Sequence, residues 1–433
     1  MRLLHAIDFY LDLNKYLFRF YFQKKEELSS IRNMQFKQII RYAYTKIPFY
    51  RNSILKHKID LGKISGLDQI SEFPVMRPED IFLKQGHTEN DIRNKPITLR
   101  SSGTTGAPKD VRLSYFDWFC LRRLAYLRMF FTSGCSVLHK TLFLSSQRPY
   151  PSIKLKWFQR LGAMRARSIS ADKPGPEIAD FFNRYRPDVF HCLTADGVIL
   201  ADLVKRSTRY AHRAKYLFTS GEILTEKDKQ EMIDNLGENV IDFYATTEAG
   251  ILAWQCGKTG AYHINADQIY VEILNGERAC NDGEVGEVVL TTLAPFSLPL
   301  IRYRTGDMAA IEHERCKCGS WFPRLTHIKG RKNDFLVNTK RENISPYLLM
   351  VIMDKFTDVL KYRICQNTLT EYVIYVRLKK HLGSETVIRE KISRAYNKIF
   401  GLGSKVSVVD LTDSHLADIG LKQKTVVSYV KTK

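Results

Sequence analysis

The sequence predicts an α/β protein, because two observations indicate a helix-covered sheet in a chain of more than one domain. Between about residues 95 and 300, short runs rich in β-branched and aromatic residues alternate with helical stretches. This alternation is typical of a mainly parallel sheet with helices on its faces. At 433 residues the chain also exceeds the size of one ordinary core. We therefore expect a large α/β domain followed by a smaller one.

The N-terminal part is expected to be helical and the middle part to carry the sheet. Apolar residues recur at near-helical spacing before the Ile47-Pro48 pair, which should end a helix. These apolar residues are Leu28, Ile31, Met34, Ile39 and Ile40. Strands are predicted at 140–144, 188–193, 216–219 and 240–244, and a helix at 176–184.

The pattern changes after residue 268. The runs 268–274 and 286–292 are separated by a Gly/Asn/Asp turn, which predicts a twisted antiparallel hairpin. Nearer the C-terminus, strands are expected at 372–377 and 406–410, beside a helix at 386–400. This second group predicts a small α+β domain of about a hundred residues.

The composition is that of a globular protein with a large excess of positive charge. Hydrophobic residues make up 44% and charged residues 26%, and the net charge is +21. Lys and Arg are spread along the chain without a basic tail, which argues against nucleic acid and favours anions such as ATP, coenzyme A or a polyanionic glycan. The apolar segment 1–22 is interrupted by charges and lacks a cleavage site. We expect a cytoplasmic protein whose N-terminus makes weak peripheral membrane contact at most.

Hydroxyl groups and glycines alternate in the run Arg100-Ser-Ser-Gly-Thr-Thr-Gly-Ala-Pro-Lys109. Gly103 and Gly106 let the backbone bend and expose N–H groups, and such a concavity of amides attracts phosphate oxygens. Hydroxyl donors and one mobile cation complete the set, namely Ser101, Ser102, Thr104, Thr105 and Lys109. The run lacks the Gly-Lys-Ser/Thr end of a Walker A loop. It predicts another kind of phosphate loop, and on its own would fit a flexible surface loop equally well.

Four further segments follow the loop. They are Phe218-Thr-Ser-Gly-Glu222, Asp242-Phe-Tyr-Ala-Thr-Thr-Glu-Ala-Gly250, Ile301-Arg-Tyr-Arg-Thr-Gly-Asp307 and Lys329-Gly-Arg-Lys-Asn-Asp334. With the loop, they resemble the ordered motifs of the adenylate-forming enzymes, the superfamily of acyl-CoA synthetases and luciferases. The segment Ala43-Tyr-Thr-Lys-Ile-Pro-Phe-Tyr-Arg51 is similar to the phenylacetate–CoA ligase-like branch, which includes proteins associated with capsular-polysaccharide genes. The resemblance extends from about residue 30 to the end of the chain.

This resemblance implies an adenylation domain over residues 1–329 and a mobile α+β domain over 330–433, with a hinge at 330–334. It also implies an ATP site in which the loop 101–109 holds the β- and γ-phosphates. Glu248 would bind Mg²⁺ as a hard oxygen ligand, and Thr247 would reach the α-phosphate. Tyr244 would stack near the adenine, although a core aromatic at a strand end is the alternative.

Three further residues acquire roles from the resemblance. Asp307 would accept hydrogen bonds from the ribose hydroxyls, and Arg331 would reach the ribose or the α-phosphate. The family places a catalytic lysine near the C-terminus, where its charge neutralises phosphate oxygens. In Gly420-Leu-Lys-Gln-Lys-Thr-Val-Val-Ser428 this lysine is Lys422 or Lys424, and the following Val-Val-Ser favours Lys422.

Cysteine spacing predicts a metal site. The Cys316-Lys-Cys318 turn is followed by a glycine and can offer two thiolates to one ion. The segment from Cys256 to His263 offers one more sulfur and one imidazole. Related ligase-like proteins carry a similar set, so we predict a closed Cys₃His site for structural Zn²⁺, with ordinary reduced cysteines as the alternative.

The predicted function is ATP- and Mg²⁺-dependent activation of a carboxylic acid, followed by acyl transfer to coenzyme A. Two alternatives stay open: transfer to an amine or hydroxyl in surface-polysaccharide synthesis, and a nucleotide-binding scaffold without turnover. Three positions depart from the family pattern, namely Ala245 for glycine, Asn333 at the hinge, and Lys340-Arg-Glu-Asn343 where a glycine is usual. The last departure concerns the approach to coenzyme A. Neither the acid nor the oligomeric state is predicted.

Overall fold

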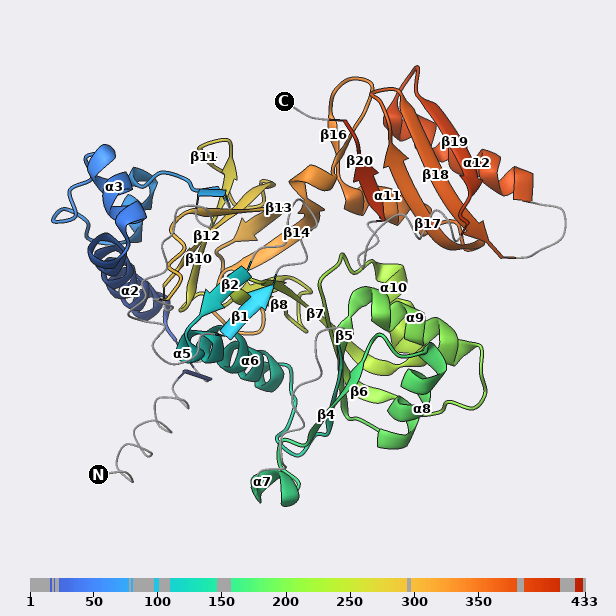
Figure 1. Ribbon diagram of the computed structural model, residues 1–433, viewed down its shortest axis with the longest axis horizontal. Coiled ribbons are helices and arrows are strands. Elements are labelled where there is room, and N and C mark those ends of the chain that lie inside the picture. Colours follow the sequence, from blue (N-terminus) through green and yellow to red (C-terminus); the bar gives the residue numbers. More distant parts are fainter. Residues whose placement is uncertain are drawn as a thin grey trace. The chain divides into compact units, whose positions relative to one another are not determined.

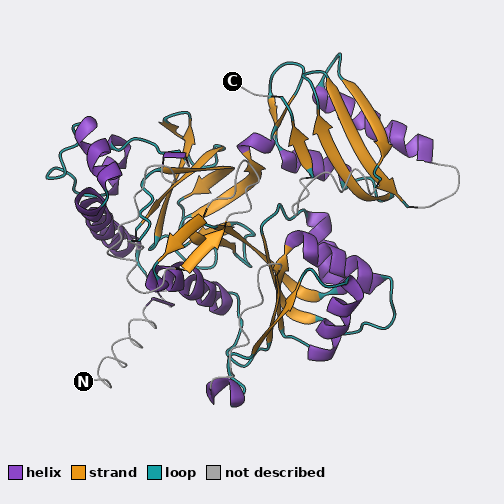
Figure 2. Cartoon of the chain, in the orientation of Figure 1, coloured by secondary structure: helices purple, strands orange, loops and turns teal. Residues whose placement is uncertain are grey.

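The computed structural model describes residues 16–17, 19, 23–77, 79–80, 97–100, 110–145, 157–293, 297–379, 385–412 and 425–430. The chain divides into two compact units, one made of described parts of 1–305 and 310–326, the other of described parts of 306–309 and 327–433. Helices and strands alternate in both (Figures 1 and 2). No helix in the described ranges is long and apolar enough to cross a membrane.

The first unit begins with helices, as the sequence predicts. Helix α2 spans Lys25–Lys46 and buries Leu28, Ile39 and Ile40, whereas Met34 is exposed. Ile47 is extended, and Pro48 starts helix α3 (Pro48–Lys56), because proline has no N–H to donate and fits the first helical position. A short 3₁₀ helix, η1, follows at Leu67–Glu72.

One twelve-stranded sheet runs through the structure in the order β11-β10-β12-β13-β14-β9-β8-β7-β6-β5-β3-β4. Its parallel strands are β3 (Thr141–Ser145), β4 (Ala166–Ser170), β5 (Val189–Leu193), β6 (Ala214–Ser220) and β7 (Gly237–Thr246). They confirm the strands predicted from 140 to 244. The same sheet continues beyond β7 with antiparallel strands, so it is mixed rather than mainly parallel throughout.

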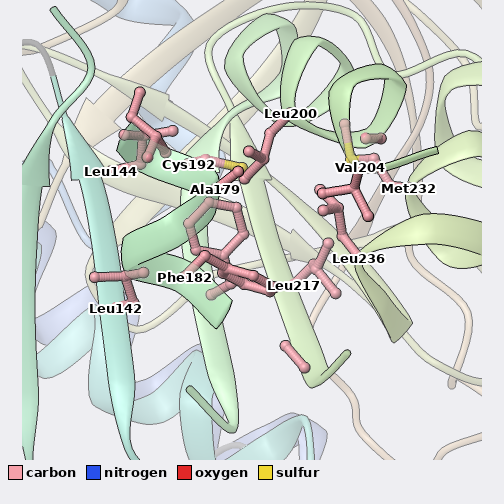
Figure 3. Packing of buried hydrophobic residues seen from close by; sticks show 14 of the residues in the cluster. Leu142, Leu144, Ala179, Phe182, Cys192, Leu200, Val204, Leu217, Met232 and Leu236 are labelled. Carbon is pink, nitrogen blue, oxygen red and sulfur yellow. The ribbon is translucent and has the colours of Figure 1, made fainter. Parts of the chain in front are cut away.

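Helices α8 (Gly175–Tyr185), α9 (Thr194–Lys205) and α10 (Glu226–Asn235) cover one face of the parallel strands (Figure 1). The core between them is largely aliphatic and includes Leu142, Phe182, Leu200, Leu217 and Met232 (Figure 3). Residues on a strand alternate between faces, so Phe143, His191 and Phe218 lie on the opposite face.

Helix α6 (Ala125–Thr132) packs near that opposite face, because Tyr126 contacts the rings of Phe143 and Phe218. It continues from α5 (Tyr115–Trp118) through a π-helical turn, η2, at Phe119–Leu124. Before it, β1 (Ile97–Arg100) pairs antiparallel with β2 (Asp110–Leu113), and Arg100 lies opposite Asp110. A short helix, α7 (Trp157–Arg160), precedes β4.

The antiparallel strands are β8 (Gly250–Gln255), β9 (Tyr262–Ile264), β10 (Ile269–Asn275), β11 (Arg278–Ala279), β12 (Gly286–Thr292), β13 (Tyr303–Glu312) and β14 (Arg324–Arg331). Strands β10 and β12 pair from Ile269↔Thr292 to Leu274↔Glu287. This pairing confirms the predicted hairpin. Buried charge pairs tie the region together, including Arg302 with Glu272 and Arg128 with Asp267.

The second unit contains a four-stranded sheet in the order β19-β18-β17-β20. Its elements are η3 (Lys332–Asp334), β15 (Leu336–Val337), β16 (Asn343–Ile344), α11 (Pro346–Met353), β17 (Val359–Gln366), β18 (Glu371–Leu378), α12 (Glu385–Phe400), β19 (Lys405–Asp410) and β20 (Val426–Ser428). The predicted strands at 372–377 and 406–410 and the predicted helix are confirmed. The exact boundary at 329/330 stays a prediction.

Candidate active site

The predicted Mg²⁺ ligand lies on a tight turn between two antiparallel strands. Strand β7 ends at Thr246, residues 247–249 form the turn, and β8 starts at Gly250. The backbone N–H of Ala249 donates to Thr246 Oγ1 at 3.1 Å, which closes the turn. Gly250 has φ +71, and a Cβ there would lie 2.5 Å from the carbonyl oxygen of Leu121, so only glycine fits.

The π-helical segment η2 contacts the turn at 247–249. Arg122 Nη2 donates to the carbonyl oxygen of Thr247 at 3.1 Å. A π-turn adds one residue to a helix and so reorients the side chains that follow, and such turns are frequent at functional sites. The position of Thr247 and Glu248 is therefore fixed by a helix more than 120 residues away in sequence.

Glu248 is partly exposed, and Tyr303 donates its hydroxyl proton to Glu248 Oε1 at 3.2 Å. Tyr303 is only 3% exposed. One carboxylate oxygen is thus oriented by a buried phenol, whereas the group keeps solvent access that a metal ion needs. Tyr303 lies in the predicted segment 301–307, but the motifs predict no role for it. Its contact with Glu248 spans 55 residues of sequence and carries no local signal.

The segment that carries Tyr303 is itself anchored. Arg302 forms an ion pair with Glu272 at 2.9 Å and donates to the carbonyl oxygen of Phe73 at 2.7 Å. Its φ of +49 is unusual for a residue with a side chain. The buried guanidinium holds this conformation in place and so sets where β13 begins.

Asp307 and Arg331 come together, although 24 residues separate them in the sequence. Arg331 Nε lies 3.6 Å from Asp307 Oδ1, the Asp307 side chain is 13% exposed and that of Arg331 is 44% exposed. Both groups therefore remain accessible to a polar ligand. Their roles toward ribose and phosphate stay predictions.

Tyr244 and Thr247 are both partly exposed, so Tyr244 is not a buried core aromatic. Its contact with adenine stays a prediction. Several predicted residues lie outside the described residues: Ser101, Ser102, Gly103, Thr104, Thr105, Gly106, Lys109, Lys422 and Lys424. The strand pair β1–β2 brackets 101–109 in sequence.

The four predicted metal ligands converge. One ligand atom each from Cys256, His263, Cys316 and Cys318 lies within 4.8 Å of all the others. The sulfurs of Cys256 and Cys316 are 3.8 Å apart, and Cys318 Sγ is 3.3 Å from His263 Nε2. Two sulfurs about 3.7 Å apart are what tetrahedral bonds of about 2.3 Å require. The residues therefore fit a zinc ion.

The protein also orients the imidazole for such a role. His263 Nδ1 donates to the carbonyl oxygen of Phe322 at 3.2 Å, which leaves Nε2 facing the cysteines. Burial lowers the pKa of His263 to about 4, so the ring is neutral and able to ligate at neutral pH. Cys256 directly follows β8, His263 lies on β9, and Cys316 and Cys318 lie between β13 and β14.

A buried carboxyl group links the strands around this site. Asp242 on β7 accepts hydrogen bonds from Thr219 Oγ1 on β6 at 3.0 Å and from the Tyr262 hydroxyl on β9 at 2.8 Å. Burial raises the pKa of Asp242 to about 7, although both hydrogen bonds act in the opposite direction. Asp242 and Thr219 belong to two of the predicted motifs, so the carboxyl group holds these motifs together.

An aromatic cluster lies on the sheet face that α6 approaches. It consists of Tyr126, Phe143, His191, Phe218 and Phe243. The His191 ring lies 5.4 Å from Phe243 and 5.2 Å from Phe143, centroid to centroid. Tyr126, Phe143 and His191 keep partial exposure. The sequence motifs did not single out these residues, because their convergence depends on strand order.

Comparisons with known proteins agree with this architecture. The structure matches that of 2-hydroxyisobutyryl-CoA ligase in the postadenylation state in complex with 2-HIB-AMP, with a TM-score of 0.77 and 19% identity over 95% of this chain and 90% of that chain. The same ligase in complex with 2-HIB-AMP and CoA in the thioesterification state gives a TM-score of 0.61 at 19% identity, covering 95% and 91%. The chain thus has the fold of the acyl-CoA ligases.

Similar curated proteins indicate which branch of the acyl-CoA ligases the chain resembles. The phenylacetate-coenzyme A ligase of Thermus thermophilus is 22% identical over 412 residues, 88% of this chain and 89% of that protein. The CapK protein of Staphylococcus aureus is 22% identical over 383 residues, 84% of this chain and 81% of that protein. No family model matches the chain. The resemblance to the phenylacetate–CoA ligase-like branch, inferred from the motifs, is confirmed.

The Asp242→Asn variant should change how stability depends on pH. The pKa of about 7 in the folded protein exceeds the ordinary 3.8, so between these values the folded state binds more protons than the unfolded state. The wild type should therefore lose stability, relative to the variant, as pH rises from about 4 to about 7. Urea unfolding across that range measures the difference. Asp234→Asn, at an exposed acid on α10, is the control; parallel curves for Asp242→Asn and wild type would contradict the assignment.

Proposed function

We propose that this protein activates a carboxylic acid with ATP and Mg²⁺ as an acyl-adenylate, and then transfers the acyl group to coenzyme A. The first step joins the acid's carboxylate oxygen to the α-phosphorus of ATP and releases pyrophosphate. The second joins the acyl carbon to the thiol sulfur and releases AMP. The ordered motifs support this proposal, as do the relatives named phenylacetate-coenzyme A ligase and the ligase whose complexes contain an adenylate and CoA.

The observation that carries the proposal is the arrangement around Glu248. Two anions, a carboxylate and a triphosphate, must approach each other, so a cation and fixed donors are needed to offset their repulsion. Glu248 can hold Mg²⁺ with one oxygen while Tyr303 fixes the other. Arg122 holds Thr247 beside it through the Thr247 carbonyl oxygen. In the second unit, Asp307 and Arg331 lie close together, and the proposal keeps for them the nucleotide-binding roles that the motifs imply.

The acid is aromatic in this proposal. Phenylacetate is the acid in the names of several relatives. The aromatic cluster of this chain, on the face approached by α6, offers rings that pack against a planar substrate at about 0.5–1.5 kcal/mol per ring pair.

Replacing Glu248 by Gln tests the first step. Without the negative charge of Glu248, Mg²⁺ binds more weakly and offsets less of the charge that develops on the phosphate. Exchange of labelled pyrophosphate into ATP should therefore fall by ~10²-fold or more. The measurement uses a panel of aryl, fatty, amino and sugar acids. Glu238→Gln, at an exposed glutamate on the same strand β7, is the matched control.

Two outcomes separate the alternatives. Unchanged exchange in Glu248→Gln would remove this residue from the metal site. ATP binding without exchange for any acid would instead indicate a nucleotide-binding scaffold. Because ATP and coenzyme A are cytoplasmic substrates, the proposal places the protein in the cytoplasm.

A second acceptor class has a specific observation in its favour. Residues 340–343 replace a segment in which the family usually has glycine, and here Arg341 adopts φ +65. Asn338 holds this turn, because its Oδ1 accepts from the N–H groups of Lys340 at 3.0 Å and Glu342 at 2.8 Å. Arg341 thus has a backbone conformation that glycine adopts easily, but it carries a long cationic side chain. Together with the CapK relative, this keeps an amine or hydroxyl acceptor of surface-glycan synthesis as the alternative.

Lys422→Ala should separate the two half-reactions. Loss of this charge should abolish acyl-adenylate formation, whereas acyl transfer from a chemically made acyl-adenylate should survive, since that route avoids phosphate displacement. Assaying transfer with coenzyme A, amines and hydroxyl acceptors also identifies the acceptor. Lys424→Ala is the control. Equal loss of both steps would make Lys422 structural, and loss of adenylation in Lys424→Ala alone would assign the role to Lys424.

We also propose that Cys256, His263, Cys316 and Cys318 bind one structural Zn²⁺. The four ligand atoms, mutually within 4.8 Å, support a closed tetrahedral site with no open position for catalysis. Such an ion would close the β8–β9 hairpin and fasten it to the segment after β13. Its contribution would be to folding rather than to chemistry.

Elemental analysis of protein purified without chelators should find about one zinc per chain. Cys316→Ser should lower the melting temperature strongly and leave ATP affinity nearly unchanged, because a closed site acts on folding. Cys135→Ser, at a buried cysteine outside the cluster, is the matched control. Metal-free wild-type protein would favour ordinary reduced cysteines.

A further inference from the structure

His191 is unusual within the aromatic cluster because it is polar. Its imidazole lies against Phe143, Phe243 and Tyr126, at centroid distances of 5.2, 5.4 and 6.0 Å. Its neighbours on β5, Phe190 and Cys192, point to the opposite, aliphatic face. An apolar ring here would avoid the cost of placing polar nitrogens among aromatic rings, so the choice of histidine needs an explanation.

The described part of the protein makes no use of the imidazole nitrogens of His191. Within the described residues, His191 has ring contacts but no hydrogen bond, and its side chain is partly exposed. A half-buried polar group in an aromatic environment is costly unless it finds a partner. A ligand that enters the cluster can supply that partner.

The cluster adjoins the candidate site for activation. Phe243 immediately precedes Tyr244 on β7. Tyr126 follows Arg122 by one helical turn, and Arg122 donates to the carbonyl oxygen of Thr247 at 3.1 Å. In the inference that follows, the carboxylate of the acid lies at the Thr247–Glu248 turn and its ring extends toward His191.

We infer that His191 is a specificity-determining residue that hydrogen-bonds a hydroxyl group on an aromatic acid, so the preferred substrates are hydroxyaryl acids rather than unsubstituted ones. This inference rests on the proposed function. A neutral imidazole offers one donor and one acceptor, which matches a phenolic hydroxyl. Burial among the rings lowers the pKa of His191 to about 4, so the ring is neutral at physiological pH. The other cluster members supply ring contacts and no formal charge, which suits a neutral substituent.

The experiment compares kcat/KM for pyrophosphate exchange with phenylacetate, its 2-, 3- and 4-hydroxy derivatives, and the matching methyl derivatives. A methyl group has nearly the size of a hydroxyl but cannot hydrogen-bond. The wild type should prefer one hydroxy isomer to phenylacetate and to its methyl counterpart by about tenfold or more. His191→Phe should remove this preference, so that the ratio of kcat/KM for the hydroxy acid to kcat/KM for phenylacetate falls about tenfold.

Two further variants separate recognition from folding. His191→Gln keeps a donor and an acceptor and should retain part of the preference. His313→Phe, at a half-exposed histidine paired with Asp282, should leave it unchanged. Thermal melts of each variant report on folding. A merely structural role for His191 would lower the rates for all acids equally.

The possible failures are distinguishable. Equal rates with hydroxy and methyl acids in the wild type, or an intact preference in His191→Phe, would overturn the inference and leave the proposed function standing. Exchange that depends only on non-aromatic acids would also overturn it. Absence of exchange with every acid of the wider panel would overturn the proposed function itself, and the inference with it.

Discussion

The buried carboxyl group of Asp242 occupies the position on which the rest of the first unit depends. It lies on β7, the strand that pairs parallel with β6 on one side and antiparallel with β8 on the other. Its oxygens accept from Thr219 on β6 and from Tyr262 on β9. One group thus joins the parallel part of the sheet to the antiparallel part. Burial removes water from this carboxyl group and so disfavours its charged form, which raises its pKa.

The two faces of the parallel strands differ in the side chains that they carry. The face under α8, α9 and α10 is covered by a cluster of buried, largely aliphatic side chains (Figure 3). The opposite face carries rings, a histidine and partly exposed positions near the Thr247–Glu248 turn. Successive side chains on each strand point to opposite faces of the sheet. The aliphatic core therefore lies behind the face that is proposed to receive the acid.

Contacts distant in sequence position the candidate site. Arg122 reaches the turn after β7, Tyr303 reaches Glu248, and Arg302 fastens the start of β13 to the backbone at Phe73. The cysteine and histidine cluster brings the β8–β9 hairpin next to the segment between β13 and β14. Each of these contacts is buried or partly buried, where hydrogen bonds and charge pairs are less weakened by water. Strands and tight turns of the first unit therefore hold Thr247, Glu248 and the four cysteine-cluster residues in place.

The sequence by itself determined the motifs, the class of fold and some of the helices and strands. Local pattern was sufficient for β3, β5, β6, β7, α8 and α12, because alternation and helical periodicity are properties of neighbouring residues. The four metal ligands could also be named, since Cys-x-Cys spacing carries chemical meaning. Only the tertiary structure decided that the sheet continues past β7 as antiparallel strands, and that Tyr303 reaches Glu248. It also decided that His191 lies among aromatic rings and that the Asp242 carboxyl joins three strands. These features depend on strand order and on which side chains meet across the sheet, and neither is written in the spacing of residues along one segment.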